Sequence, residues 1–173
     1  MFRILSPNTC RKKGGCFNLL EEVLDHIKVE IKQLERLFAE YDDFLRYLKR
    51  EEPNKIELMA IASILHSFYN GLENVFRSVA KNLDHQIPSG HQWHQELLSQ
   101  MTRATDRRTA LLSADTTAIL KDYLLFRHFF RHAYSFFLDW NRCRTLIQFL
   151  PEVWEKVRND FESFIQVSES SNK

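Results

Sequence analysis

The sequence predicts an all-α protein, because apolar side chains recur at three- and four-residue steps along most of the chain. Two further observations agree with this class. No segment alternates apolar and polar residues as a half-buried strand would, and the chain has only 4 glycines in 173 residues. This length is close to the size of one ordinary domain. We therefore expect a single bundle of four to five main helices.

Two long helices are expected first. The apolar periodicity from Phe17 to about Arg50 predicts one long amphipathic helix. Pro53 is compatible with the first turn of a second helix, which continues to about Leu83 and can pair with the first as an antiparallel hairpin. The segment before Phe17 contains a proline, two glycines and a basic triplet, and we expect it to be a flexible leader.

A break and a short helix come next. Pro88 and Gly90 predict a turn, and a short helix is expected from about Trp93 to Met101, ahead of a polar loop.

Two more helices complete the expected bundle. Ser113 or Asp115 can cap a fourth helix that runs to about Phe136, and a last helix is expected after Asp139, ending near Val167. The expected division of the chain is a leader at 1–16, a helical domain at 17–168 and a frayed polar tail at 169–173.

The charge balance excludes a strongly basic or acidic protein. Lys+Arg number 24 and Asp+Glu 23, which leaves a net charge of +1, so any anion site must be local. The 3 cysteines are an odd number without zinc-knuckle spacing and fit a reducing compartment, the cytoplasm. No apolar stretch is long enough for a membrane span, and the apolar run at the N-terminus is too short for a signal peptide.

The segment LLFRHFFRHAYSF, residues 124–136, carries two arginines, two histidines and a tyrosine among aliphatic and aromatic side chains. A helix turns about 100° per residue, so the polar residues in and after this segment fall on two adjoining stripes. One stripe holds Arg127, Arg131 and Tyr134, and the other holds His128, His132 and Asp139.

Four interpretations of these stripes are open. They can form a solvated helix face, or a metal site of His128, His132 and Asp139, although that pattern lacks a general-base glutamate and a clear third ligand, so no metal is expected. They can bind a nucleotide through arginine–phosphate contacts and aromatic stacking. They can also cleave a phosphodiester, with a histidine moving protons and an arginine stabilising charge. A further pair, His91 and His94, is expected at a cap or on the surface.

The order Arg127, four residues, His132, one residue, Tyr134 resembles the Arg-x4-His-x-Tyr signature of HepT-like toxins in the HEPN ribonuclease superfamily. His128 fits the polar position that follows the arginine in that family. The segments FYNGLENVFRSVA, IPSGHQWHQELLSQM and FRHFFRHAYSFFLDW also look like HepT-type sequence, in the expected order. The resemblance covers about residues 20–165.

The resemblance implies a HEPN-type up-down helical bundle that acts as a homodimer. It implies the toxin of a HEPN/MNT toxin–antitoxin module: a metal-independent endoribonuclease without cofactor, which cleaves RNA, with transfer RNA as the expected substrate, by 2′-OH attack at the dimer interface. A geometric point agrees with the dimer. Arg127 and His132 diverge by about 140° on one straight helix, so one copy cannot easily aim both at the same phosphate, whereas two copies that meet at a cleft can.

Carried over residue by residue, the resemblance gives each signature residue a role. His132 takes the proton of the ribose 2′-OH, which suits an imidazole with an ordinary pKa near 6.5. Arg127 binds the scissile phosphate. Tyr134 is the tyrosine to which an MNT-type nucleotidyltransferase antitoxin adds AMP, which silences the nuclease; an interface aromatic is the simpler reading. His128 is an auxiliary polar contact.

Other residues are assigned more loosely. Arg131 is either a phosphate contact or a surface residue, and Glu73 either orients Arg127 by an ion pair or faces water. A loop cluster is expected to contact RNA or the antitoxin, and consists of Arg103, Arg107 and Arg108. The alternative function is a catalytically inactive HEPN-like bundle that binds a nucleotide or a protein partner.

Overall fold

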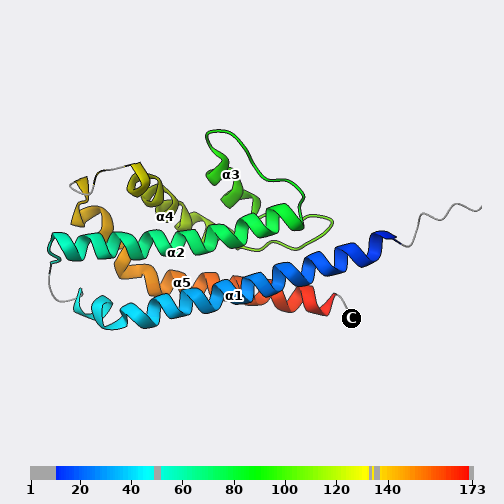
Figure 1. Ribbon diagram of the computed structural model, residues 1–173, viewed down its shortest axis with the longest axis horizontal. Coiled ribbons are helices and arrows are strands. Elements are labelled where there is room, and N and C mark those ends of the chain that lie inside the picture. The colour runs from blue at the N-terminus through cyan, green and yellow to red at the C-terminus, as the bar shows by residue number, and fades with distance from the viewer. Residues whose placement is uncertain (1–10, 49–51, 133, 135–136, 172–173) are drawn as a thin grey trace, which may run out of the picture.

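The computed structural model describes residues 11–48, 52–132, 134 and 137–171, with side chains from Leu19 onward. Apart from one isolated bridge, these residues form helices, turns and loops without a β-strand, which confirms the all-α class. The helices are α1 (Arg11–Tyr47), α2 (Lys55–Asn82), α3 (Trp93–Gln100), α4 (Ala114–His132) and α5 (Trp140–Ser170) (Figure 1).

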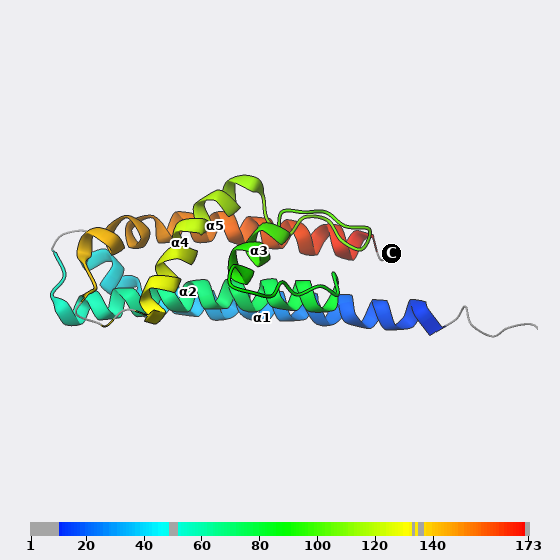
Figure 2. The same cartoon turned by 90° about the horizontal axis from the view of Figure 1, so that it is seen from above.

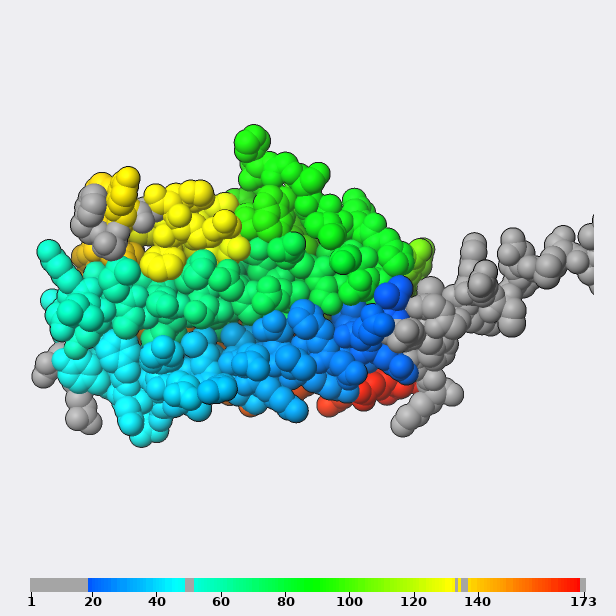
Figure 3. Space-filling model, viewed as in Figure 1, coloured from blue at the N-terminus to red at the C-terminus, as the bar shows by residue number. Residues whose placement is uncertain are grey.

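Helix α2 is the centre of the bundle, because it contacts each of the other four helices. Helices α1, α2 and α5 run lengthwise in up-down fashion, while α3 and α4 cover a further side of α2 (Figures 1 and 2). Helix α4 crosses α2 obliquely, and its atoms border those of α3 on one face of the molecule (Figures 2 and 3). None of the helices in the described part of the chain is both long and apolar enough to traverse a lipid bilayer.

An aromatic cluster joins four of the helices in one core. Phe68 of α2 is fully buried and meets Tyr123 of α4 edge-on, with ring centroids 5.5 Å apart. Trp154 of α5 lies 6.5 Å from Phe68 and stacks on Phe38 of α1 at 6.0 Å. Such offset and edge-to-face pairs add to the free energy that area burial alone supplies. The cluster therefore fixes α4 and α5 relative to the α1–α2 hairpin.

Side-chain caps define where three helices begin. Asn54 and Glu57 form a reciprocal capping box, so α2 begins at Lys55. The expectation that Pro53 occupies the first turn is therefore wrong, because the cap lies after it. Of the two candidate caps for α4, Ser113 serves: its Oγ accepts a first-turn backbone N–H at 3.2 Å. Asp139 caps α5 in the same way.

Three expected boundaries differ from the structure. Helix α1 begins at Arg11, inside the expected leader, since the Gly14–Gly15 pair weakens a helix without ending it. Helix α4 ends at His132, because the chain must reverse before α5 and its cap takes an extended backbone. Helix α5 continues to Ser170, where Glu169 pairs with Lys28 of α1 at 2.9 Å. Residues 1–10 and 172–173 lie outside the described residues.

Candidate functional site

A polar stripe runs along α2 on the side that faces α3 and α4. His66, Asn70, Glu73 and Arg77 follow one another at steps of four, three and four residues, which places them on one face of the helix. Glu73 is only 5% exposed, on a helix that is otherwise mostly apolar inside. A buried carboxylate needs a partner, and α4 supplies it.

Arg127 of α4 reaches across to this stripe. Its Nη2 donates to Glu73 Oε1 at 3.0 Å, and its Nε donates to Asn70 Oδ1 at 2.9 Å. The residue is 6% exposed. Burial lowers the pKa of Arg127 and raises that of Glu73, and each charge opposes the shift of the other. The ion pair with Glu73 that the sequence suggested is thus present in the structure.

His94 completes the cluster from α3. Its Nδ1 lies 3.0 Å from Glu73 Oε2, and the ring lies 3.4–3.5 Å from Nη1 of Arg127. Burial, and then the charge of Arg127, lower the pKa of His94 to about 4, so the ring is neutral at pH 7. A neutral ring that donates Nδ1–H to Glu73 leaves its Nε2 lone pair facing the guanidinium. The carboxylate therefore accepts from both α3 and α4.

The two signature histidines continue from this cluster toward solvent. His128 is half-buried and stands perpendicular to His94, with ring centroids 4.9 Å apart. Burial and then Arg127 lower the pKa of His128. His132, the last residue of α4, is exposed and lies 6.4 Å from His128 with nearly parallel rings. Arg131 is exposed beside them. A buried cation and an exposed imidazole therefore lie on the same two turns of helix.

Tyr134 lies beyond the end of α4 and is 71% exposed. The expectation that it shares a helical stripe with Arg127 is wrong, because the helix stops two residues before it. Asp139 likewise does not join His128 and His132 but caps α5. Within residues 11–48, 52–132, 134 and 137–171, no three side chains of the metal-ligating types gather around a point.

The three loop arginines separate into two kinds. Arg103 and Arg107 are exposed, and Arg107 donates one long bond to the carbonyl of Leu83 at 3.4 Å. Arg108 is buried and forms a bidentate pair with Asp84, with both N–O distances 2.7 Å. It also donates to three backbone carbonyls. The expected RNA contact by Arg108 is therefore corrected: this side chain holds the loop together and has no free donor face.

Sequence reasoning missed two members of the cluster, His94 and Asn70. His94 was expected at a cap or on the surface, whereas it is 5% exposed and hydrogen-bonds Glu73. Asn70 links Arg127 to His66, since its amide also donates to His66 Nε2 at 2.8 Å. The signal that points to Asn70 is the polar spacing of four, three and four residues along the buried side of α2, which an amphipathic surface helix would place outward.

The structure is an all-α bundle in which a buried arginine cluster lies beside a helix end that carries two histidines. Residues 60–168, well over half of the chain, match the family described as HepT-like protein, and the chain belongs to that family of the HEPN superfamily. It is thus a HEPN-type, toxin-like protein. No curated protein and no solved structure matches the chain significantly.

Glu73→Gln tests the buried pair. The substitution keeps the shape of the side chain and leaves Arg127 as an uncompensated buried charge, so the free energy of unfolding should fall by about 3 kcal/mol in urea denaturation. Glu155→Gln is the matched control, because Glu155 pairs with Arg158 on the surface. That variant should change stability by less than about 0.5 kcal/mol. Equal effects of the two substitutions contradict the assignment.

The low pKa of His94 predicts a loss of stability in mild acid. The folded pKa of about 4 lies below the unfolded value near 6.5, so the unfolded chain takes up the proton first as the pH falls. The contribution of His94 to the free energy of unfolding is complete above pH 6.5 and declines toward pH 4. The loss between pH 7 and pH 5 amounts to about 2 kcal/mol. The decline should shrink in His94→Gln and persist in the exposed control His91→Gln, measured by urea denaturation at both pH values.

Proposed function

We propose that the protein is the toxin of a HEPN/MNT toxin–antitoxin module and a metal-independent endoribonuclease, with transfer RNA as the expected substrate and the cytoplasm as its place of action. The observation that supports this most is the arrangement at the end of α4. His132 is exposed there, and His128 links it by ring contacts to the Arg127 cluster. Tyr134, two residues later, is also exposed to solvent.

In this proposal His132 is the general base. It takes the proton of a ribose 2′-OH, the 2′-oxygen forms a bond to phosphorus, and the bond from phosphorus to the 5′-oxygen breaks. The leaving oxygen receives a proton from an imidazolium, and the products are a 2′,3′-cyclic phosphate and a 5′-hydroxyl. The exposure of His132 supports the role, because RNA can reach the ring without rearrangement of the bundle.

Arg127 supplies the positive charge in this scheme. A guanidinium has five N–H donors, and the contacts with Asn70, Glu73 and His94 use three of them, so two donors remain for a phosphate. Because the Arg127 side chain is buried, a phosphate would have to enter beside His128 to reach it, rather than bind on an open surface. Arg131, exposed one turn later, would assist as a second phosphate contact.

A homodimer is part of the proposal. Arg127 points into the protomer and His132 points outward, so one α4 does not present both groups to one phosphate. Two α4 ends that face each other across a twofold axis would place the exposed imidazole of each protomer near the phosphate site of the other. Tyr134 and Phe137, 71% and 58% exposed beside His132, would lie at or near this contact.

Tyr134 is the proposed site of control. An MNT-type nucleotidyltransferase antitoxin would join its phenolic oxygen to the α-phosphate of ATP, releasing pyrophosphate and the phenol proton. The position supports this, because the side chain is 71% exposed and only two residues from His132. An AMP group there adds negative charge and bulk at the cleft, which repels the RNA backbone.

One observation favours the alternative function, a catalytically inactive bundle that binds a nucleotide or a protein. Arg127 is 6% exposed and is held in a complete ion pair, as a purely structural arginine would be. An inactive protein has no need, however, for an exposed His132 next to His128, and this is why we place the nuclease first.

RNA cleavage separates the two functions. Wild-type protein incubated with a transfer RNA pool in EDTA should produce fragments with 2′,3′-cyclic phosphate and 5′-hydroxyl ends. His132→Ala should reduce the rate by about 10²–10⁴-fold, the usual worth of a general base. His91→Ala, which removes an exposed histidine elsewhere, should leave the rate unchanged. RNA that stays intact with every variant supports the inactive binder. Fragments with 5′-phosphate ends would contradict the 2′-OH mechanism.

Mass spectrometry tests the assignment of Tyr134. The protein mixed with an MNT-type partner and ATP should gain one or more AMP units and lose its ribonuclease activity. Tyr134→Phe should gain none and should stay active. Tyr41→Phe, which removes another partly exposed tyrosine, should be modified like the wild type. Modification that survives in Tyr134→Phe contradicts the assignment.

A further inference from the structure

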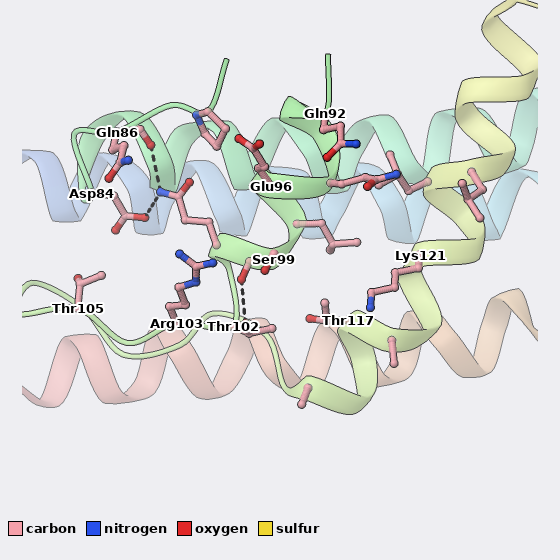
Figure 4. Close-up of a pocket in the computed structure, with 18 of the residues that line it drawn as sticks. Asp84, Gln86, Gln92, Glu96, Ser99, Thr102, Arg103, Thr105, Thr117 and Lys121 are labelled. Atoms are coloured by element: carbon pink, nitrogen blue, oxygen red, sulfur yellow. Dashed lines mark hydrogen bonds between the residues drawn. The ribbon is translucent and has the colours of Figure 1, made fainter. Parts of the chain in front are cut away.

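A cavity of about 970 Å³ opens between α3, the α3–α4 loop and the first half of α4 (Figure 4). Its volume is typical of sites that hold small molecules. The cavity does not include Arg127 or the signature histidines, but α3 and α4 border both sites. Neither the signature nor the proposed chemistry explains it.

Three cations line this cavity and form no ion pair with any described residue: Arg103, Arg107 and Lys121. Lys121 of α4 extends toward Thr117, and Arg103 of the loop lies on the other side of the C-terminal turn of α3 (Figure 4). The nearby Asp84 carboxylate is already neutralised by Arg108. Cations placed on two sides of a turn suit an extended polyanion better than a single anion.

The remaining polar groups of the cavity suit nucleotide bases. Gln92, Gln95 and Glu96 of α3 line it, and amide and carboxylate side chains of these types pair with the amino and ring groups of bases. Thr117 supports a polar occupant: it lines the cavity, is 7% exposed, and its Oγ1 has no hydrogen-bond partner among the described atoms.

One face of α4 connects the cavity to the signature histidines. Lys121, Leu125, His128 and His132 follow at steps of four, three and four residues and so share a face. Lys121 and His132 are separated by about 16 Å along the helix axis. Leu125, which lines the cavity and is 57% exposed, offers an apolar surface between them.

We propose that this cavity is a subsite that binds nucleotides of the single-stranded RNA next to the cleaved linkage, with Lys121 and Arg103 on its phosphates. This rests on the proposed ribonuclease function and adds to it the place where the substrate is recognised. The strand would run along α4, from the cavity past Leu125 to His128 and His132.

Binding of an RNA that resists cleavage tests the subsite directly. A short fluorescein-labelled single-stranded RNA with 2′-O-methyl groups lacks the nucleophile, so anisotropy reports binding alone. Lys121→Gln and Arg103→Gln should each weaken binding about three- to tenfold at 0.15 M salt and reduce the slope of log K against log salt by about 0.7. Lys156→Gln, an exposed lysine of α5 outside the cavity, is the matched control and should bind as the wild type does.

Two further results discriminate among occupants. If 5′-AMP binds in a Lys121-dependent manner while the oligonucleotide binds equally to all variants, a free nucleotide is the occupant and the RNA subsite is overturned. If all variants bind RNA equally and only an MNT-type partner binds Lys121→Gln less tightly, a protein interface overturns it.

The subsite and the nuclease can fail separately. Binding that depends on Lys121, in a protein that never cuts RNA, supports the subsite and removes the nuclease. Cleavage that depends on His132, with wild-type binding by Lys121→Gln and Arg103→Gln, keeps the nuclease and removes the subsite.

Discussion

The buried ion pair between Arg127 and Glu73 is the constraint on which the arrangement of this bundle depends. A charge that is buried without a partner costs several kcal/mol, so α4 can pack on α2 only in the register that brings these two residues together. His94 Nδ1 lies within hydrogen-bond distance of the second carboxylate oxygen of Glu73, and the side-chain carbonyl of Asn70 accepts from Nε of Arg127. Three helices are thereby fixed to one another by a polar contact, inside a core that is otherwise aromatic and aliphatic.

This constraint also determines what α4 shows to solvent. Once Arg127 points inward, His132 lies about 140° away from it around the helix and is exposed. The same rotation turns Lys121 and Leu125 toward the cavity beside α3. The division between a buried cation and an exposed imidazole is therefore a consequence of packing. The cation is held in place by its hydrogen-bond partners, while the imidazole at the helix end is exposed to solvent.

The fold class and the order of the helices could be predicted from the sequence, because three- and four-residue apolar spacing carries that information locally. The ends of helices were less certain. Pro53 looked like a first-turn residue, but the Asn54 capping box begins α2, and α4 stops at His132 because of a reversal that only the packing of α5 requires. The partnership of Glu73 and Arg127 was suggested by sequence. The inclusion of His94 was not, since this residue follows a turn in the sequence, and only the packing of α3 on α2 brings its ring to Glu73.

The buried state of Arg127 is tested most directly by NMR hydrogen exchange of arginine side chains. The Nε–H of Arg127 donates to Asn70 inside the bundle, whereas Arg131 is exposed one turn later on the same helix and serves as an internal reference. A slowly exchanging Nε–H signal, assigned by its loss in Arg127→Lys, is the result predicted for a locked guanidinium. Exchange as fast as that of Arg131 would contradict the account, since the pair with Glu73 would then be open to water.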